Sequence, residues 1–222
     1  MSDPNQDEMT RRAFLYTAGL GALATGSAGV LLMPLAASAA AKVSEPAPTF
    51  ALPSTTGGTV SLADQKGKVV VLEWTNHDCP YVRKHYETGN MQAIQKESTA
   101  VGVVWLTIIS SAPGTQGHVS PAEANDLTSK RSAAPTAVLL DPKGTVGKAY
   151  GATNTPHMYV IDKAGMLVYA GAIDDRPTSR RADVPGATNY VRAALESATA
   201  GQPVKTPLTR AYGCTVKYLY QL

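Results

Sequence analysis

The chain is poor in cysteine: its 222 residues include only Cys79 and Cys214, which lie far apart. No C-x-x-C pair occurs, which excludes redox cycling within one four-residue motif and excludes a disulfide-rich scaffold. The histidines also lack the H-x-x-x-H spacing of a metal site, so we expect no metal and no cofactor. A metal site remains the alternative only if distant ligands converge, the candidates being Cys79, His77, His85, His118 and His157.

Basic clusters are also scarce, although the formal net charge is +3. Beyond residue 40 the basic pairs Arg83-Lys84, Lys130-Arg131 and Arg180-Arg181 are spread along the chain, which excludes the concentrated basic face that nucleic-acid binding needs. The hydrophobic content of 44% suits one ordinary core and excludes a disordered, collagen-like or coiled-coil chain. We therefore expect one globular domain that does not bind nucleic acid.

Long apolar runs are missing after residue 40, but one precedes it. Residues 10–15 (TRRAFL) lead into the apolar residues 16–35, and Ala37-Ser38-Ala39 forms a small-x-small pattern. Together they resemble a twin-arginine export signal, removed by cleavage after Ala39. This predicts a signal peptide over residues 1–39, a folded substrate of the twin-arginine translocase, and a periplasmic or otherwise extracytoplasmic location in a bacterium. The alternative is an uncleaved membrane anchor.

The remaining sequence alternates strand and helix patterns, which predicts an α/β domain over residues 40–222. A turn at Gly57-Gly58 predicts an amino-terminal hairpin, and residues 201–222 form a tail whose Val216, Tyr218, Leu219 and Tyr220 we expect to pack back on the domain. The expected central strands are residues 68–74, 101–109, 136–140, 158–161 and 167–170. The expected helices are residues 82–97, a helix that begins at Pro121 and is capped by Ser120, residues 146–150 and residues 189–200.

Cys79 follows the apolar strand predicted over residues 68–74 and precedes Pro80, which suits the first turn of a helix. Backbone N–H groups and the helix dipole at such a position favour an anion, and the thiolate is the reactive form of cysteine. His77 and Arg83 flank this position and add positive potential, although His77 could equally be a solvated turn residue.

Several segments now carry a resemblance to a known family. Residues 74–82 (WTNHDCPYV) resemble the active-site segment of thioredoxin-like and peroxiredoxin-like proteins, and residues 155–162 (TPHMYVID) resemble the threonine-cis-proline strand that faces it. Residues 169–175 and 211–218 resemble later segments of a redoxin subfamily within the alkyl hydroperoxide reductase and thiol-specific antioxidant superfamily. The resemblance spans most of residues 46–218. It implies a three-layer thioredoxin-like fold with a central mixed sheet flanked by helices.

Two departures from the family pattern bear on function. The motif after the active cysteine is Cys79-Pro80-Tyr81-Val82, so the usual resolving cysteine is absent and Cys214 is the remaining candidate. Peroxidases of the family place a threonine or serine three residues before the cysteine and a proline seven before it. Here those positions hold Asn76 and Leu72, and Thr75 is one residue out of place.

The resemblance implies a thiol oxidoreductase, with antioxidant activity if the substrate is a peroxide. Cys79 would attack a disulfide-bearing protein or a peroxide, Cys214 would resolve the product, and a thiol reductant would regenerate the pair. Thr155, Pro156, Pro80 and Tyr81 would position the substrate or partner, and Asn76, His77 and Arg83 would tune the site. The alternative is a non-catalytic binding module in which a permanent Cys79–Cys214 disulfide staples the tail.

Overall fold

The computed structural model describes residues 40–219, so the export signal predicted for residues 1–39 lies outside the described part of the chain. Within residues 40–219 no helix is both long enough and apolar enough to cross a membrane.

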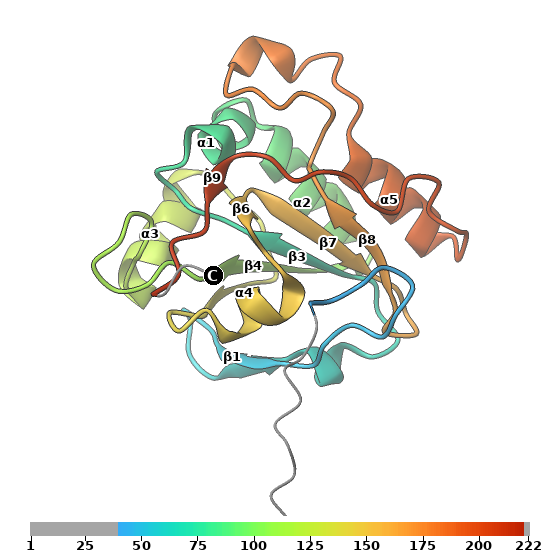
Figure 1. Ribbon diagram of the computed structural model, residues 1–222, viewed down its shortest axis with the longest axis horizontal. Helices are drawn as coiled ribbons and strands as arrows, with labels where there is room; N and C mark the ends of the chain where they lie inside the picture. The colour runs from blue at the N-terminus through green and yellow to red at the C-terminus, as the bar shows by residue number, and fades with distance from the viewer. Residues whose placement is uncertain (1–39, 220–222) are drawn as a thin grey trace, which may run out of the picture. The chain divides into compact units, whose positions relative to one another are not determined.

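A five-stranded mixed sheet forms the centre of the domain (Figure 1). Its strands are β3 (Val70–Trp74), β4 (Val104–Ile109), β5 (Ala137–Leu140), β7 (His157–Ile161) and β8 (Leu167–Gly171). They are ordered β5-β4-β3-β7-β8, with β3 parallel to β4 and antiparallel to β7. All five side chains of β3 are buried, which explains why its sequence is apolar rather than alternating. All five predicted central strands are confirmed.

Each face of the sheet is covered by a separate hydrophobic cluster. One cluster joins Leu72 and Trp74 to Tyr150 of helix α4 (Thr145–Tyr150) and to the predicted amino-terminal hairpin, β1 (Ala51–Pro53) and β2 (Thr59–Ser61). The other is covered by helices α1 (Pro80–Glu87), α2 (Asn90–Ala100) and α5 (Tyr190–Thr199). The expected three-layer arrangement, with its hairpin, is therefore confirmed.

The helix predicted over residues 82–97 is two helices. Helix α1 begins at Pro80 and ends at Glu87, and α2 begins at Asn90 after Gly89, whose φ of 76° is left-handed. A left-handed residue cannot continue a right-handed helix, so the chain changes direction there. Helix α3 (Pro121–Lys130) starts as predicted, because the Ser120 side chain and Glu123 form a capping box.

One buried side chain of β3 is charged. Glu73 is fully buried and accepts hydrogen bonds from Tyr86, Gln95, Trp105 and Thr107 at distances of 2.7 to 3.1 Å. Burial raises the pKa of the Glu73 carboxyl, while the four donors oppose that rise. The donors come from α1, α2 and β4, so this carboxyl ties the helical layer to the sheet.

The tail returns across the domain and adds a short strand. Strand β9 (Cys214–Thr215) pairs antiparallel with β6 (Asn154–Thr155), a pairing that the sequence did not predict. Figure 1 shows β9 beside β6, with the tail running from α5 over β8 toward α3. Val216 is buried and the Tyr218 hydroxyl donates to the Ala152 carbonyl, as expected for a tail that packs back. Leu219, in contrast, is 58% exposed, so that prediction is wrong; Tyr220 lies outside the described residues.

The stability of the central strand is testable at Leu72, which is fully buried between the two neighbouring strands. We expect Leu72→Ala to lower the free energy of unfolding by about 2–5 kcal/mol, because it leaves a cavity in the core. Val101→Ala, at a position 72% exposed, is the control and should change it by no more than about 0.5 kcal/mol. Equal effects in urea denaturation would contradict this packing.

Candidate functional site

Cys79 lies at the N-cap of α1, where the carboxyl end of β3 meets the helix. Its side chain makes no capping hydrogen bond; instead Sγ donates to the Thr155 carbonyl oxygen at 3.1 Å. The residue is 0% exposed, and its backbone carbonyl accepts the first helical bond, from Arg83 N. The thiol therefore stands at the positive end of the helix and faces the Thr155-Pro156 segment.

The Thr155-Pro156 peptide bond is cis, as the resemblance implies. This geometry puts Thr155 at the end of β6, with its carbonyl on the Cys79 thiol and its backbone paired to β9. Pro156 separates β6 from the central strand β7.

Strand β9 places the second cysteine at the same point. In the β6–β9 register Cys214 stands opposite Thr155, and the Thr155 hydroxyl donates to the Cys214 carbonyl at 3.3 Å. Gly213 allows this approach: its φ is 122°, and a Cβ there would lie 2.0 Å from the Thr155 carbonyl oxygen. Asn154 Nδ2 donates to the Gly213 carbonyl at 3.0 Å. Only glycine fits between β6 and the tail at this position.

Both cysteines are free, and the Cys214 side chain packs against the hydrophobic cluster that contains Cys79. Burial, followed by a hydrogen bond with the Cys79 side chain and the Cys79 charge, raises the pKa of the Cys214 thiol to about 12, against a small opposing effect of Lys217. Cys214 therefore holds its proton at neutral pH. Its reactivity depends on the charge state of Cys79.

The residues expected to tune the site are held by other parts of the chain. Asn76 caps its own turn, accepting from Asp78 N at 2.9 Å, and the Arg83 guanidinium pairs with Glu87 at 2.9 Å. His77 lies 3.4 Å from the Asp78 carboxylate. Within residues 40–219, no hydrogen bond joins Asn76, His77 or Arg83 to either thiol.

Thr75 lines a cavity that Cys79 does not line. The cavity is small and lies between β4, β5 and α3, with Thr107, Thr128 and Arg131 also in its wall. The Thr75 Oγ1 is buried with no hydrogen-bond partner in the described part of the chain. Thr75 is therefore not placed to orient a peroxide on the Cys79 thiol.

Pro80 and Tyr81 begin α1 directly after Cys79. Tyr81 is half-buried, and its ring lies 5.9 Å from the ring of Tyr212 in the tail. Pro80 and Tyr81 thus adjoin both cysteine-bearing segments.

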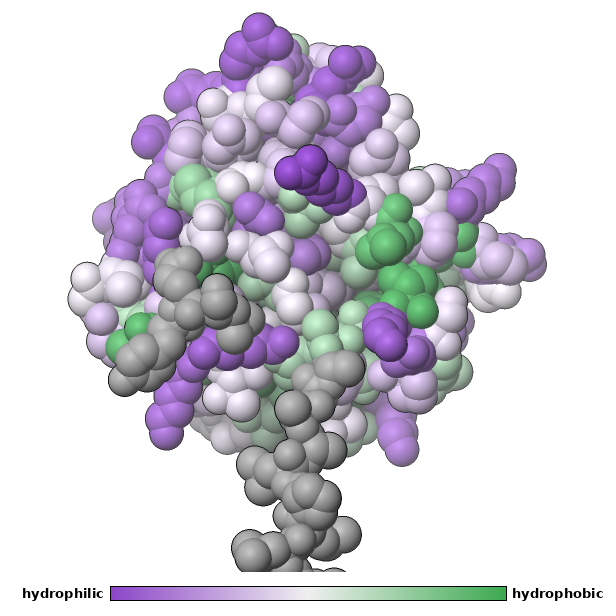
Figure 2. Space-filling model, in the orientation of Figure 1, coloured by the Kyte–Doolittle hydropathy of each residue, from purple (hydrophilic) through white to green (hydrophobic). Residues whose placement is uncertain are grey.

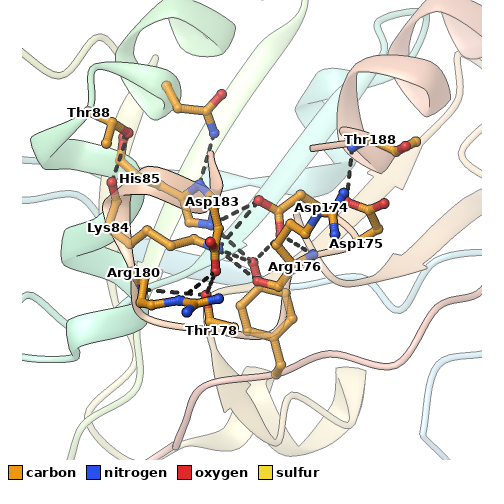
Figure 3. Close-up of polar contacts among 12 residues, drawn as sticks. Lys84, His85, Thr88, Asp174, Asp175, Arg176, Thr178, Arg180, Asp183 and Thr188 are labelled. Carbon is orange, nitrogen blue, oxygen red and sulfur yellow. Dashed lines mark hydrogen bonds and ion pairs between the residues drawn. The ribbon is translucent and has the colours of Figure 1, made fainter. Parts of the chain in front are cut away.

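A buried charged cluster next to the thiols was missed by sequence reasoning. Lys84 and His85 of α1 meet Asp174, which follows β8, and Tyr212 of the tail; Figure 3 shows Lys84 and His85 pointing toward Asp174. The side chains of Lys84, His85 and Asp174 are at most 2% exposed. No local sequence signal joins Lys84 to Asp174, which lies 90 residues further along the chain.

The charges in this cluster are set by burial. Burial lowers the pKa of Lys84, an effect that the Asp174 carboxylate opposes. It also lowers the pKa of His85 to about 3, with the Lys84 charge adding to the fall, so His85 is neutral at pH 7. The cluster is thus an ammonium–carboxylate pair with a neutral imidazole and a phenol.

Sequence and structure comparisons relate the chain to known proteins. The AhpC/TSA family model matches residues 43–170. The thioredoxin-like protein YneN of Bacillus subtilis is 27% identical over 141 residues, which are 62% of this chain and 77% of YneN. An uncharacterized conserved protein of Geobacillus kaustophilus superposes with a TM-score of 0.71 at 26% identity, covering 82% of this chain and 94% of its own. A hypothetical protein of Sinorhizobium meliloti is 23% identical and also superposes with a TM-score of 0.71, covering 82% of this chain and 98% of its own. At this identity the likeness shows the fold alone.

The protonation of Cys214 is testable in a Cys79→Ser variant, in which Cys214 is the only thiol. Serine removes the charge of Cys79 but not the burial, so we expect the rate of maleimide labelling to rise with an apparent pKa above 9 and below about 12. The same variant unfolded in guanidinium is the control and should show the ordinary cysteine value. An apparent pKa of 9 or lower in the folded protein would contradict the burial of Cys214.

Proposed function

The chain belongs to the AhpC/TSA family, and from that membership and the meeting of its two cysteines at Thr155 we propose that it is a thiol oxidoreductase. Cys79 makes the first attack, and Cys214 resolves the product as an intramolecular disulfide. The placement of Cys214 opposite Thr155, whose carbonyl accepts from the Cys79 thiol, carries this proposal. The similarity to a thioredoxin-like protein also supports a redox role.

Each cysteine carries out one step of the proposed reaction. When the Cys79 thiolate attacks a disulfide, a bond forms between Cys79 and one substrate sulfur, and the other sulfur leaves as a thiol. Cys214 then attacks Cys79, the Cys79–Cys214 bond forms, and the second substrate sulfur leaves as a thiol. The substrate is reduced by two electrons, and a thiol reductant restores the pair.

The charge coupling between the thiols orders these steps. The pKa of Cys214 is raised in part by a hydrogen bond with Cys79 and by the negative charge of Cys79. Once Cys79 is in a mixed disulfide its charge is gone and both contributions disappear. Cys214 therefore ionises more readily after the first attack, which is when a resolving nucleophile is needed.

The surroundings of Cys79 favour disulfide exchange over peroxide reduction. A peroxide needs polar groups that orient it on the attacking sulfur, yet Thr75 lines another cavity, Asn76 caps its own turn and Leu72 is in the core. A disulfide needs mainly a thiolate and a resolving thiol in reach. We propose that Thr155 and Pro156, with Pro80 and Tyr81, form the surface on which the disulfide substrate lies.

The amino-terminal sequence supports action outside the cytoplasm. Residues 1–39 carry the twin-arginine pattern, and an extracytoplasmic compartment is where protein disulfides form and need exchange. We propose export by the twin-arginine translocase and a periplasmic location. A non-catalytic binding module with a permanent Cys79–Cys214 bond is the alternative.

The division of labour predicts different defects for the two cysteines. Cys79→Ser should lose all turnover of a small disulfide, because no nucleophile remains. Cys214→Ser should react once at Cys79 and stop as a mixed disulfide, detected by intact mass. Non-reducing peptide mapping of the oxidised wild-type protein should show the Cys79–Cys214 bond. Retained turnover in Cys79→Ser would rule out this mechanism.

Substrate class is tested by stopped-flow kinetics of the reduced protein. We expect Cys79 to be consumed faster by a small disulfide than by hydrogen peroxide at equal concentration, because Asn76 and Leu72 replace the residues that peroxidases of the family place before the cysteine. The Cys79→Ser protein supplies the baseline for each oxidant. Faster consumption by peroxide would make the protein a peroxidase, and slow reaction with both would favour the binding module.

A further inference from the structure

The tail covers the thiol that has to react. We define the strap as residues 208–218, which cross the domain between β8 and the loop after β4. At one end Thr209 N donates to the Ala170 carbonyl at 3.0 Å, and at the other Lys217 accepts from Ala112 N at 2.8 Å. Between these ends β9 pairs with the edge of β6, and the Cys79 side chain is 0% exposed.

An extended partner would pair with the same edge. Peptides add to open strand edges through backbone hydrogen bonds, and β6 uses its edge for β9. The strap therefore stands where the segment carrying a substrate disulfide would lie, with Cys214 in the place of the substrate cysteine. Reaction with a protein disulfide needs this part of the strap to leave, and resolution needs it to return.

One side chain ties the middle of the strap to α1. The Tyr212 hydroxyl lies 3.1 Å from Lys84 Nζ and 3.1 Å from His85 Nε2, and it donates to the Asp174 carboxylate. The Lys84 ammonium also stands over the Tyr212 ring, 5.1 Å from its centre. Tyr212 is thus the strap's contribution to the buried cluster, two residues before Cys214.

The cluster makes this contact hard to replace. Lys84 and Asp174 are 3.5 Å apart and almost fully buried while the strap is in place, and a buried charged group that loses a hydrogen-bond partner is destabilised. Moving the strap away takes the phenol from the ammonium, the carboxylate and the imidazole together. Displacement of the strap therefore has a substantial energetic cost, and its return restores the three hydrogen bonds of the Tyr212 hydroxyl together.

We propose that Tyr212 is a positioning residue that latches the strap to α1, so that Cys214 stays beside Cys79 and Cys79 stays covered until a partner displaces the strap. The covering of Cys79 follows from the structure alone. The effect on resolution rests on the proposed function. Both thiols are then positioned by one helix, since Cys79 caps α1 and Lys84 and His85 hold Tyr212 from the same helix.

The latch is tested with Cys79 as the only thiol. In a Cys214→Ser background, we expect Tyr212→Phe to raise the rate at which iodoacetamide labels Cys79 about tenfold, because the phenyl ring retains the shape of the side chain but loses the hydroxyl. Tyr150→Phe in the same background is the matched control, since the Tyr150 hydroxyl also donates a hydrogen bond, to the Pro48 carbonyl, but lies in the cluster on the other face of the sheet, and it should leave the rate unchanged. Equal labelling rates in all three proteins would overturn the proposal.

A second readout separates a latch from a general loss of stability. With both cysteines present, Tyr212→Phe should form the Cys79–Cys214 bond from the mixed disulfide several-fold more slowly than the wild-type protein does. A small external thiol should cleave the mixed disulfide of Tyr212→Phe at the same rate as that of Cys214→Ser. Slowing of both routes, or of neither, would contradict a positioning role. If Tyr212→Phe does not fold, Asp174→Asn, which weakens the same latch, takes its place with the same expectations.

These outcomes also distinguish the latch from the proposed function. Labelling of Cys79 requires no redox turnover, so faster labelling in Tyr212→Phe together with a wild-type protein that forms no Cys79–Cys214 bond would retain the latch and reject the oxidoreductase. Normal bond formation in wild type with unchanged labelling in Tyr212→Phe would retain the oxidoreductase and reject the latch.

Discussion

The pairing of β9 with β6 is the contact on which the rest of the site depends. It brings Cys214 opposite Thr155, whose carbonyl already accepts from the Cys79 thiol, and so unites two cysteines that are distant in the sequence. The approach is close enough that Gly213 cannot carry a side chain. Everything proposed about the chemistry, including the choice of Cys214 as the resolving thiol and the covering of Cys79, follows from this short ladder and from the cluster that holds the strap against α1.

The two thiols that we propose as nucleophile and resolving group lie in different surroundings. Cys79 stands at the start of a helix, where the dipole favours an anion, whereas Cys214 sits in a strand, where burial and the neighbouring sulfur keep its proton in place. The difference is not fixed, because part of the pKa shift of Cys214 comes from Cys79 itself. In the proposed mechanism, formation of the mixed disulfide at Cys79 removes that part of the shift and leaves the part due to burial.

Local sequence patterns were enough to predict the strand and helix on either side of Cys79, but not the tail contacts that bring Cys214 to them. The apolar run before Cys79 and Pro80 after it identify a buried strand followed by a helix, and the structure confirms both; the helix break at Gly89 depends on one left-handed residue within an otherwise helical pattern. The β6–β9 ladder is only two residues long, too short for any periodicity to show. The contact of Lys84 with Tyr212 is a tertiary one between helix and tail, which composition and spacing do not encode.

The central claim is that the two cysteines exchange between reduced and disulfide-bonded forms as part of a working cycle. Its most direct test is the reduction potential of the Cys79–Cys214 bond, measured by equilibrating the full chain with thiol–disulfide redox buffers and quantifying both forms by peptide mapping. A structural disulfide resists reduction, with a potential below about −300 mV, whereas a bond that cycles is less stable. The account predicts a potential above that value. A value below it would contradict the account and identify the bond as a permanent staple of the tail.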